Sequence, residues 1–100
     1  MVDIPHAKFK LGRVVGTPAA LEAIRDSGES IWTFLARHLA CDWGDLDAED
    51  KRLNDEALEN GSRLLSAYQT AKGVRLWVIT EAADDRGNRA STCILTPDEY

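Results

Sequence analysis

The clearest pattern in the chain is a helical repeat of apolar positions between residues 30 and 40. Apolar side chains at i, i+3, i+4, i+7 and i+8 share one face of an α-helix. Ser30 precedes the repeat as an N-cap residue would, and Gly44 is the expected end of the helix. The residues on the predicted buried face are Ile31, Phe34, Leu35, His38 and Leu39.

Two more helices are indicated by their terminal residues. Thr17 followed by Pro18 is an N-cap with proline at the first helical position, and Gly28 stands where that helix would end. Asp47 opens the other helix, which Gly61 would end. This last helix has a thin apolar stripe, so we expect it to lie on the surface.

The other segments with a regular residue pattern are predicted to be strands. Residues 9–15 alternate between apolar and polar, and 64–70, 74–80 and 90–96 are β-branched or aromatic runs. Gly73 ends a short hairpin connection between the second and third strands. We therefore predict one α+β domain over residues 1–100, in the order β-α-α-α-β-β-β. Its antiparallel sheet has about four strands, with the helices packed on one face.

The negative charge is concentrated in one third of the sequence. The net charge is −5, and residues 31–60 account for all of it, with eight acids against three bases. Such a balance disfavours binding to nucleic acid, which needs lysine and arginine to replace counterions. DNA binding by the arginines of the C-terminal strands is therefore the least favoured function. These arginines are Arg63, Arg75, Arg86 and Arg89.

The acidic run has two interpretations. A charged, solvated helix face is the usual one. The alternative is a row of carboxylates that imitates phosphates and binds a protein partner with a basic surface. The spacing does not match a calcium-binding loop. The candidate partner-binding residues are Asp45, Asp47, Glu49, Asp50, Asp55, Glu56 and Glu59.

His38 is the candidate for chemistry, because it stands on the apolar face one turn before Asp42. A His38–Asp42 pair could serve acid–base catalysis, but without a nucleophile or cleft it more commonly anchors a helix end. His38 and Cys41 also have helical spacing for two metal ligands, although a zinc site needs about four. We therefore expect no catalytic residues, metal or cofactor, and keep a small hydrolase or metal-dependent enzyme as the alternative.

Three further features narrow the class of protein. No segment has the roughly 20 apolar residues of a membrane helix, and the N-terminus lacks a signal-peptide pattern. The two cysteines, Cys41 and Cys93, do not form a disulfide framework, so we expect a cytoplasmic location. Core packing would explain each of Trp32, Trp43 and Trp77, whereas an exposed tryptophan beside the acidic run would indicate an interface.

Several segments also resemble a known family. Residues 9–21, 35–45, 64–70, 79–82 and 97–100 carry the similarity, which covers nearly the whole chain. They include Leu35-Ala36-Arg37-His38, Asp42-Trp43-Gly44-Asp45 and the ending Pro97-x-Glu99-Tyr100. These segments resemble a family of small uncharacterised proteins borne on bacterial plasmids and integrative elements. The loop from Ala83 to Ala90 departs from that family by its greater length.

The resemblance implies a mobile-element accessory protein and supplies no established activity. Elements of this kind carry small acidic proteins that bind and block host defence machinery. The combined expectation is a non-enzymatic inhibitor of host defence, of anti-restriction or anti-CRISPR type, that acts as a nucleic-acid mimic.

Overall fold

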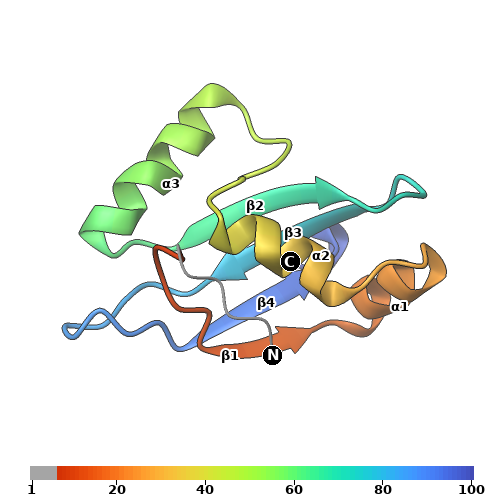
Figure 1. Ribbon diagram of the computed structural model, residues 1–100, viewed down its shortest axis with the longest axis horizontal. Coiled ribbons are helices and arrows are strands. Elements are labelled where there is room, and N and C mark those ends of the chain that lie inside the picture. Colours follow the sequence, from red (N-terminus) through yellow and green to blue (C-terminus); the bar gives the residue numbers. More distant parts are fainter. Residues whose placement is uncertain (1–6) are drawn as a thin grey trace.

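A computed structural model describes residues 7–100 as a four-stranded sheet with three α-helices (Figure 1). The predicted α+β class, strand number and element order are confirmed. The elements are β1 (Arg13–Gly16), α1 (Pro18–Asp26), α2 (Ile31–Leu39), α3 (Ala48–Asn60), β2 (Leu64–Gln69), β3 (Arg75–Thr80), β4 (Ser91–Leu95) and a final 3-10 turn, η1 (Pro97–Glu99).

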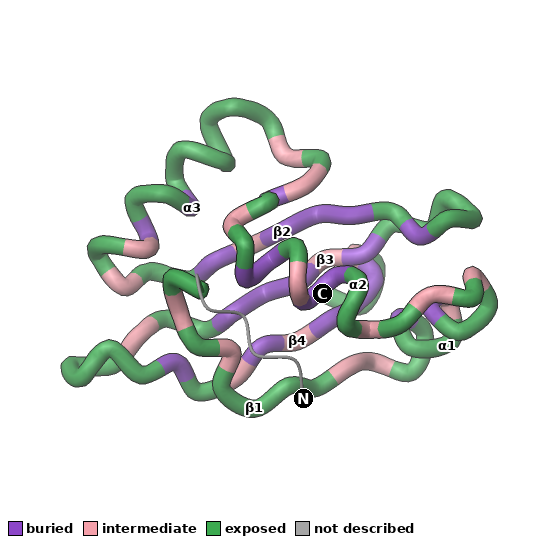
Figure 2. The backbone as a smooth tube through the Cα atoms, in the orientation of Figure 1, coloured by how far each residue is buried: buried purple, intermediate pink, exposed green. Residues whose placement is uncertain are grey.

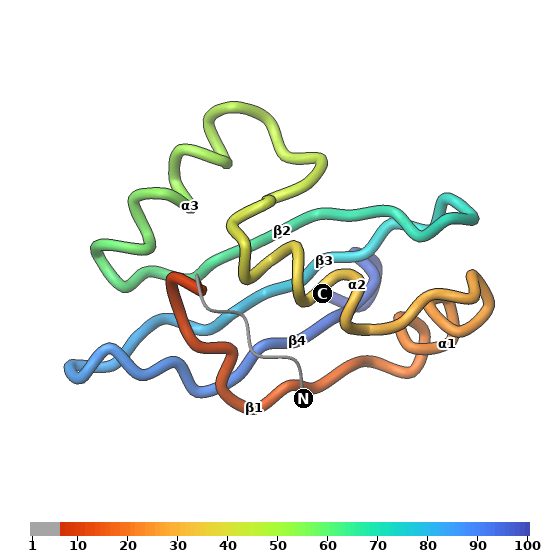
Figure 3. Tube along the Cα trace, in the orientation of Figure 1, coloured from red at the N-terminus to blue at the C-terminus, as the bar shows by residue number. Residues whose placement is uncertain are grey.

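The sheet is mixed, so the prediction of a wholly antiparallel sheet was wrong at one edge. Its strand order is β1-β4-β3-β2 (Figure 3), with β2–β3 and β3–β4 antiparallel. β1 instead runs parallel to β4, and Arg13 lies opposite Ser91. Parallel neighbours need a long crossover connection, which the three helices and two intervening strands provide here. Local patterns do not encode which distant strand an edge strand joins.

The first strand is shorter than the alternation over residues 9–15 predicted. Gly12 has φ +64°, and a Cβ there would lie 2.2 Å from the carbonyl oxygen of Arg89. The chain therefore turns at Gly12, and only the residues after it join the sheet. Phe9 and Leu11 lie outside β1 and pack against buried clusters, whereas Val15 is 38% exposed.

All three predicted helix starts are confirmed by their N-cap hydrogen bonds. Thr17 Oγ1, Ser30 Oγ and Asp47 Oδ1 accept from the amides of the third, second and third residues that follow them. The helices contain 9, 9 and 13 residues. Within residues 7–100, no helix has the length and apolar character needed to span a membrane.

The predicted end of α2 at Gly44 was wrong, because the helix ends at Leu39. Cys41 adopts a left-handed backbone with φ 62°, its amide donates to His38 O, and the Asp42 amide donates to Arg37 O. These two bonds form a Schellman motif in which cysteine takes the usual place of glycine. Gly44 instead allows the backbone to approach β2 closely. Its φ is +78°, and a Cβ there would lie 1.9 Å from Ala67 O in β2.

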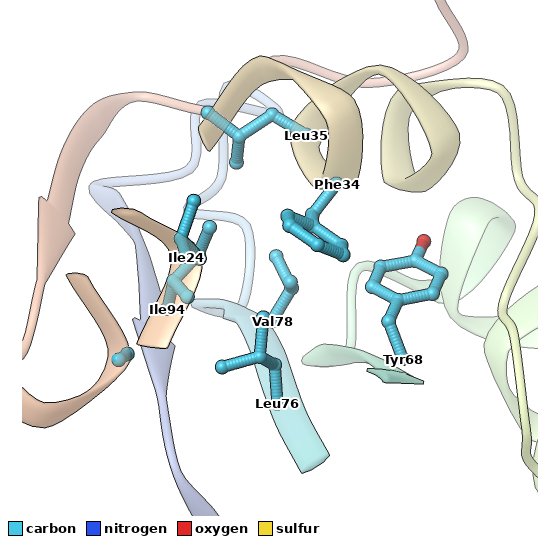
Figure 4. Packing of buried hydrophobic residues seen from close by; sticks show 8 residues of the cluster. Ile24, Phe34, Leu35, Tyr68, Leu76, Val78 and Ile94 are labelled. Atoms are coloured by element: carbon cyan, nitrogen blue, oxygen red, sulfur yellow. The ribbon is translucent and has the colours of Figure 1, made fainter. Parts of the chain in front are cut away.

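The main core lies where α2 crosses the sheet (Figure 1). Phe34 and Leu35 are each 1% exposed, as the helical repeat predicted. They pack with Val78 of β3 and Ile94 of β4, and Figure 4 shows these side chains converging. That all three helices share one face stays a prediction.

Candidate functional site

His38 lies wholly inside the molecule. Its exposed fraction is 0%, and both its ring nitrogens have side-chain partners. Nδ1 lies 2.6 Å from Ser66 Oγ in β2, and Nε2 lies 2.9 Å from Thr80 Oγ1 in β3. Phe9 and Trp43 contact the imidazole edge-on, with ring centroids 5.1 and 5.7 Å away.

The hydrogen bonds around His38 form a chain that fixes its tautomer. Thr92 Oγ1 donates to Leu11 O at 2.7 Å, so its oxygen is left to accept from Thr80 Oγ1, also at 2.7 Å. The Thr80 oxygen then accepts from His38 Nε2–H. Nδ1 is consequently the acceptor for the Ser66 hydroxyl. Every polar side chain in this series of hydrogen bonds has a partner while the imidazole is neutral.

The neutral state of His38 is strongly favoured in the fold. Burial lowers the pKa of His38 to about 4, and the positive charge of Arg89 acts in the same direction. Ser66, Thr80 and Thr92 are each 0% exposed, so no substrate reaches the hydroxyls beside the ring. His38 therefore stabilises the fold and has no access to perform acid–base catalysis.

The predicted His38–Asp42 pair was wrong. The Asp42 carboxylate accepts from Arg37 Nε at 2.6 Å and from the Gly44 amide at 3.2 Å. The Arg37 guanidinium is the main cause that lowers the pKa of Asp42. Because α2 ends at Leu39, Asp42 no longer follows the helical spacing that would have placed it beside His38.

The alternative metal pair of His38 and Cys41 loses its support as well. Both His38 nitrogens are hydrogen-bonded, and the left-handed backbone of Cys41 takes it out of helical register. Burial raises the pKa of the Cys41 thiol, which disfavours the thiolate that a metal needs. Across residues 7–100, no group of three or more His, Cys, Asp or Glu residues could hold a metal ion.

The acidic run forms an exposed surface that extends around α3 and the segment before it, since Asp50 and Glu59, nine residues apart, lie on opposite sides of the helix. We call this surface the acidic α3 face. All seven predicted partner-binding carboxylates are exposed, and α3 extends beyond the β2 side of the sheet (Figures 1 and 2). Its members are Asp45, Asp47, Glu49, Asp50, Asp55, Glu56 and Glu59.

Several of these carboxylates already have partners within the chain. Arg52 pairs with both Glu49 and Glu56 on the helix surface. Asp47 caps α3, and Asp55 accepts from the Trp43 indole at 3.0 Å. Asp45, Asp50 and Glu59 make no side-chain hydrogen bond or ion pair with any residue in 7–100, so they are the carboxylates most available to a partner.

A few directional bonds attach α3 to the rest of the molecule. The Asn54 amide donates to Leu65 O at 2.6 Å and accepts from Leu65 N at 3.0 Å, as a neighbouring strand would. Arg89 donates to Ala57 O, Ser62 O and Glu81 O, which joins the end of α3 to the strands. Ala57 and Asn54 are the buried residues of the helix.

The burial of Arg89 weakens the alternative that the four arginines of the C-terminal strands bind DNA. Arg89 is 6% exposed and bonded to three carbonyl groups, so it cannot contact phosphate. The Arg63 guanidinium lies over the Tyr100 ring, 5.7 Å from its centroid. Of the four arginines, Arg75 and Arg86 are left as exposed side chains without such contacts among residues 7–100.

Sequence reasoning missed the polar residues that organise the interior. Ser66, Thr80 and Thr92 stand in strands at positions that looked ordinary, but all three are fully buried. A polar residue at an inward position of a strand was the available signal, and it needed the strand register to be recognised. Asn54 gave a second signal, since it interrupts the thin apolar stripe of α3.

Comparisons with known proteins leave the site to be interpreted from its own geometry. No protein-family model, curated protein or solved structure matches the chain.

Proposed function

We propose that this chain is a non-enzymatic protein-binding module that engages a basic surface of its partner through the acidic α3 face. The observation that carries the proposal is the exposure of all seven carboxylates, which lie on α3 and the segment before it, together with the burial of just two residues of that helix. A helix anchored this lightly contributes little to the core, so its acidic composition is free to serve recognition.

The resemblance to plasmid-borne proteins extends this proposal to a biological role. The partner would be a host defence nuclease in the cytoplasm, and the carboxylates would stand where nucleic-acid phosphates bind. A buried His38 with no route to substrate supports a role other than catalysis.

Charge reversal tests the proposal without disturbing the fold. We expect Asp45→Lys, Asp50→Lys and Glu59→Lys together to reduce partner capture at least tenfold, because these carboxylates are exposed and unpaired among residues 7–100. Asp55 and Glu56 are left intact, since Asp55 bonds Trp43 and Glu56 pairs with Arg52. The measurement is quantitative pull-down from host lysate, followed by titration of the recovered protein.

A matched variant separates the surface from the net charge. Glu22→Lys, Asp26→Lys and Asp98→Lys change three exposed acids elsewhere, so both variants shift the charge from −5 by the same amount. The control should retain full binding. Equal loss in both variants, or no loss in the first, would contradict the acidic α3 face as the interface.

A further inference from the structure

β1 leaves one edge of the sheet open within the described chain. It is the outermost strand, and the amides of Arg13 and Thr17 donate to Ala90 O and Ile94 O on the β4 side. Because backbone groups alternate in direction along a strand, the amides of Val14 and Gly16 face away from β4. Figure 2 shows this edge as exposed, and Val14 is 37% exposed.

The opposite edge of the sheet is closed, which makes the open edge of β1 distinctive. At β2, the Asn54 side chain bonds both backbone groups of Leu65. Further along, Ala67 N donates to Trp43 O, and Ala67 O accepts from Asp45 N. Exposed edges invite pairing with other chains and are usually protected in this way. Residues 7–100 supply no such cover for β1.

An apolar hollow adjoins the open edge. Its volume is about 390 Å³, and its lining includes Phe9, Leu11, Val14, Trp32 and Leu39. Trp32 is 43% exposed there, whereas Trp43 is 4% exposed. Trp32 of α2 therefore lines this hollow, and no residue of the acidic α3 face is among the described residues that line it. A side chain from an added strand would find an apolar site beside Val14.

Basic residues continue the same hollow. A second hollow of about 410 Å³ shares Phe9 and Lys10 with the first and adds Lys8 and Arg86. Among residues 7–100, no carboxylate lines either hollow. No carboxylate in residues 7–100 forms an ion pair with these three cations. The groove beside the open strand therefore carries Lys8, Lys10 and Arg86, and only Lys8 also lines a neighbouring hollow that contains Glu59 and Asp84 within residues 7–100.

We propose that β1 binds an extended segment of a partner protein as an added fifth strand, with apolar and acidic side chains at every second position, on the face that meets the two hollows. The backbone of Val14 and Gly16 would supply the hydrogen bonds, as in other strand-addition complexes. Apolar side chains of the segment would enter the hollow beside Trp32. Its carboxylates would meet Lys8, Lys10 and Arg86, which is the charge complementarity that selects an acidic segment. The binding edge is β1 and not α3, although Lys8 also lines a neighbouring hollow with Glu59 of the acidic α3 face.

The probe for this proposal is a random dodecapeptide library displayed on phage and selected against the immobilised protein. We expect the selected peptides to carry both apolar and acidic residues on one strand face, at positions i, i+2 and i+4. Synthetic copies should shift the amide resonances of Val14 and Gly16 and slow their hydrogen exchange, with α3 amides unchanged. Failure to select peptides, or peptides whose shifts map to α3, would overturn the proposal.

Paired variants test the two parts of the recognition. Lys10→Glu with Arg86→Glu should weaken peptide binding at least tenfold, whereas Lys72→Glu with Arg75→Glu, an equal charge change at another exposed site, should leave it unchanged. Val14→Pro removes an amide that bonds nothing in the sheet, and proline is tolerated on edge strands, so it should fold yet bind at least tenfold more weakly. If Val14→Pro does not fold, the charge variants and the exchange data decide.

Two other occupants give distinct results. A concentration-dependent dimer by ultracentrifugation, with Val14 and Gly16 protected from exchange in the absence of peptide, would show a second copy of the chain on β1. Shifts of the same amides by a single-stranded DNA oligonucleotide, with none by peptides, would show a nucleic-acid site. Either result would overturn the proposed peptide segment.

Discussion

The interior beneath α2 and the attachment of α3 use different interactions. α2 inserts Phe34 and Leu35 into a cluster with residues of α1, β2, β3 and β4. α3 buries Ala57 in a smaller cluster and depends on hydrogen bonds that Asn54 and Arg89 donate and that Asp55 accepts. Apolar packing spreads its stabilisation over many contacts, whereas a few directional bonds can be broken together. The difference suggests that α3 can open while the core under α2 stays folded.

The largest expected effect separates the two helices directly. Leu35→Ala should lower the free energy of unfolding by about 2–5 kcal/mol, because the side chain is 1% exposed and leaves a cavity. Leu53→Ala in α3 makes the same chemical change at a residue that is 49% exposed, and should cost less than about 0.5 kcal/mol. Urea unfolding of both variants measures the contrast. Similar losses would contradict the distinction between the two helices.

The second effect tests the polar interior of the α2 region by pH. The pKa of His38 is about 4 in the fold, below the value near 6.5 of an unfolded histidine. The neutral ring therefore contributes stability that is complete above about pH 6.5 and is lost as pH falls towards 4, in total about 3 kcal/mol.

His38→Gln serves as the reference for that measurement, because glutamine does not titrate. Wild-type stability relative to His38→Gln should rise from pH 4 to pH 7 in urea unfolding. The difference between the two proteins cancels the pH-dependent contribution of carboxylates such as Asp42 and Glu99. Their lowered pKa values make both proteins less stable in acid. A difference that is flat, or that grows towards acidic pH, would rule out a buried neutral imidazole.

The smallest effect concerns the attachment of α3. Asn54→Ala removes both hydrogen bonds to Leu65 and should cost about 1–3 kcal/mol. Hydrogen exchange should accelerate in α3 before it does in α2. Asn54→Asp retains the acceptor for Leu65 N but sets a buried carboxylate against Leu65 O, so it should loosen α3 at least as much as Asn54→Ala. Equal acceleration in both helices would show that α3 does not open on its own.

Local chemistry made the helix starts predictable. Thr17, Ser30 and Asp47 each accept a hydrogen bond from an amide in the first turn of the helix that they were predicted to begin. The strands β2, β3 and β4 were located within a residue or so, because β-branched runs and turn residues are local signals. The end of α2 was missed because Cys41, and not a glycine, adopts the left-handed conformation.

The candidate site depended on contacts that sequence spacing cannot supply. His38 bonds Ser66 and Thr80, which are 28 and 42 residues away along the chain. The carboxylate expected to hold it is bonded to Arg37 instead. The exposure of the acidic run was predictable from its charge. That Asp55 and Glu56 are bonded to residues within the chain could be recognised only once the fold was known.

The parallel pairing of β1 with β4 has a consequence for the order of folding during synthesis. Arg13 emerges from the ribosome long before Ser91, its partner in the sheet. α1 and α2 can form early from local signals, but their sheet is incomplete until the β2–β3 hairpin and then β4 have been made. Contacts of such long sequence separation slow folding and leave apolar surface exposed in the meantime. We expect nascent chains stalled before residue 91 to be protease-sensitive throughout β1, and release of longer chains to protect the whole sheet in one step.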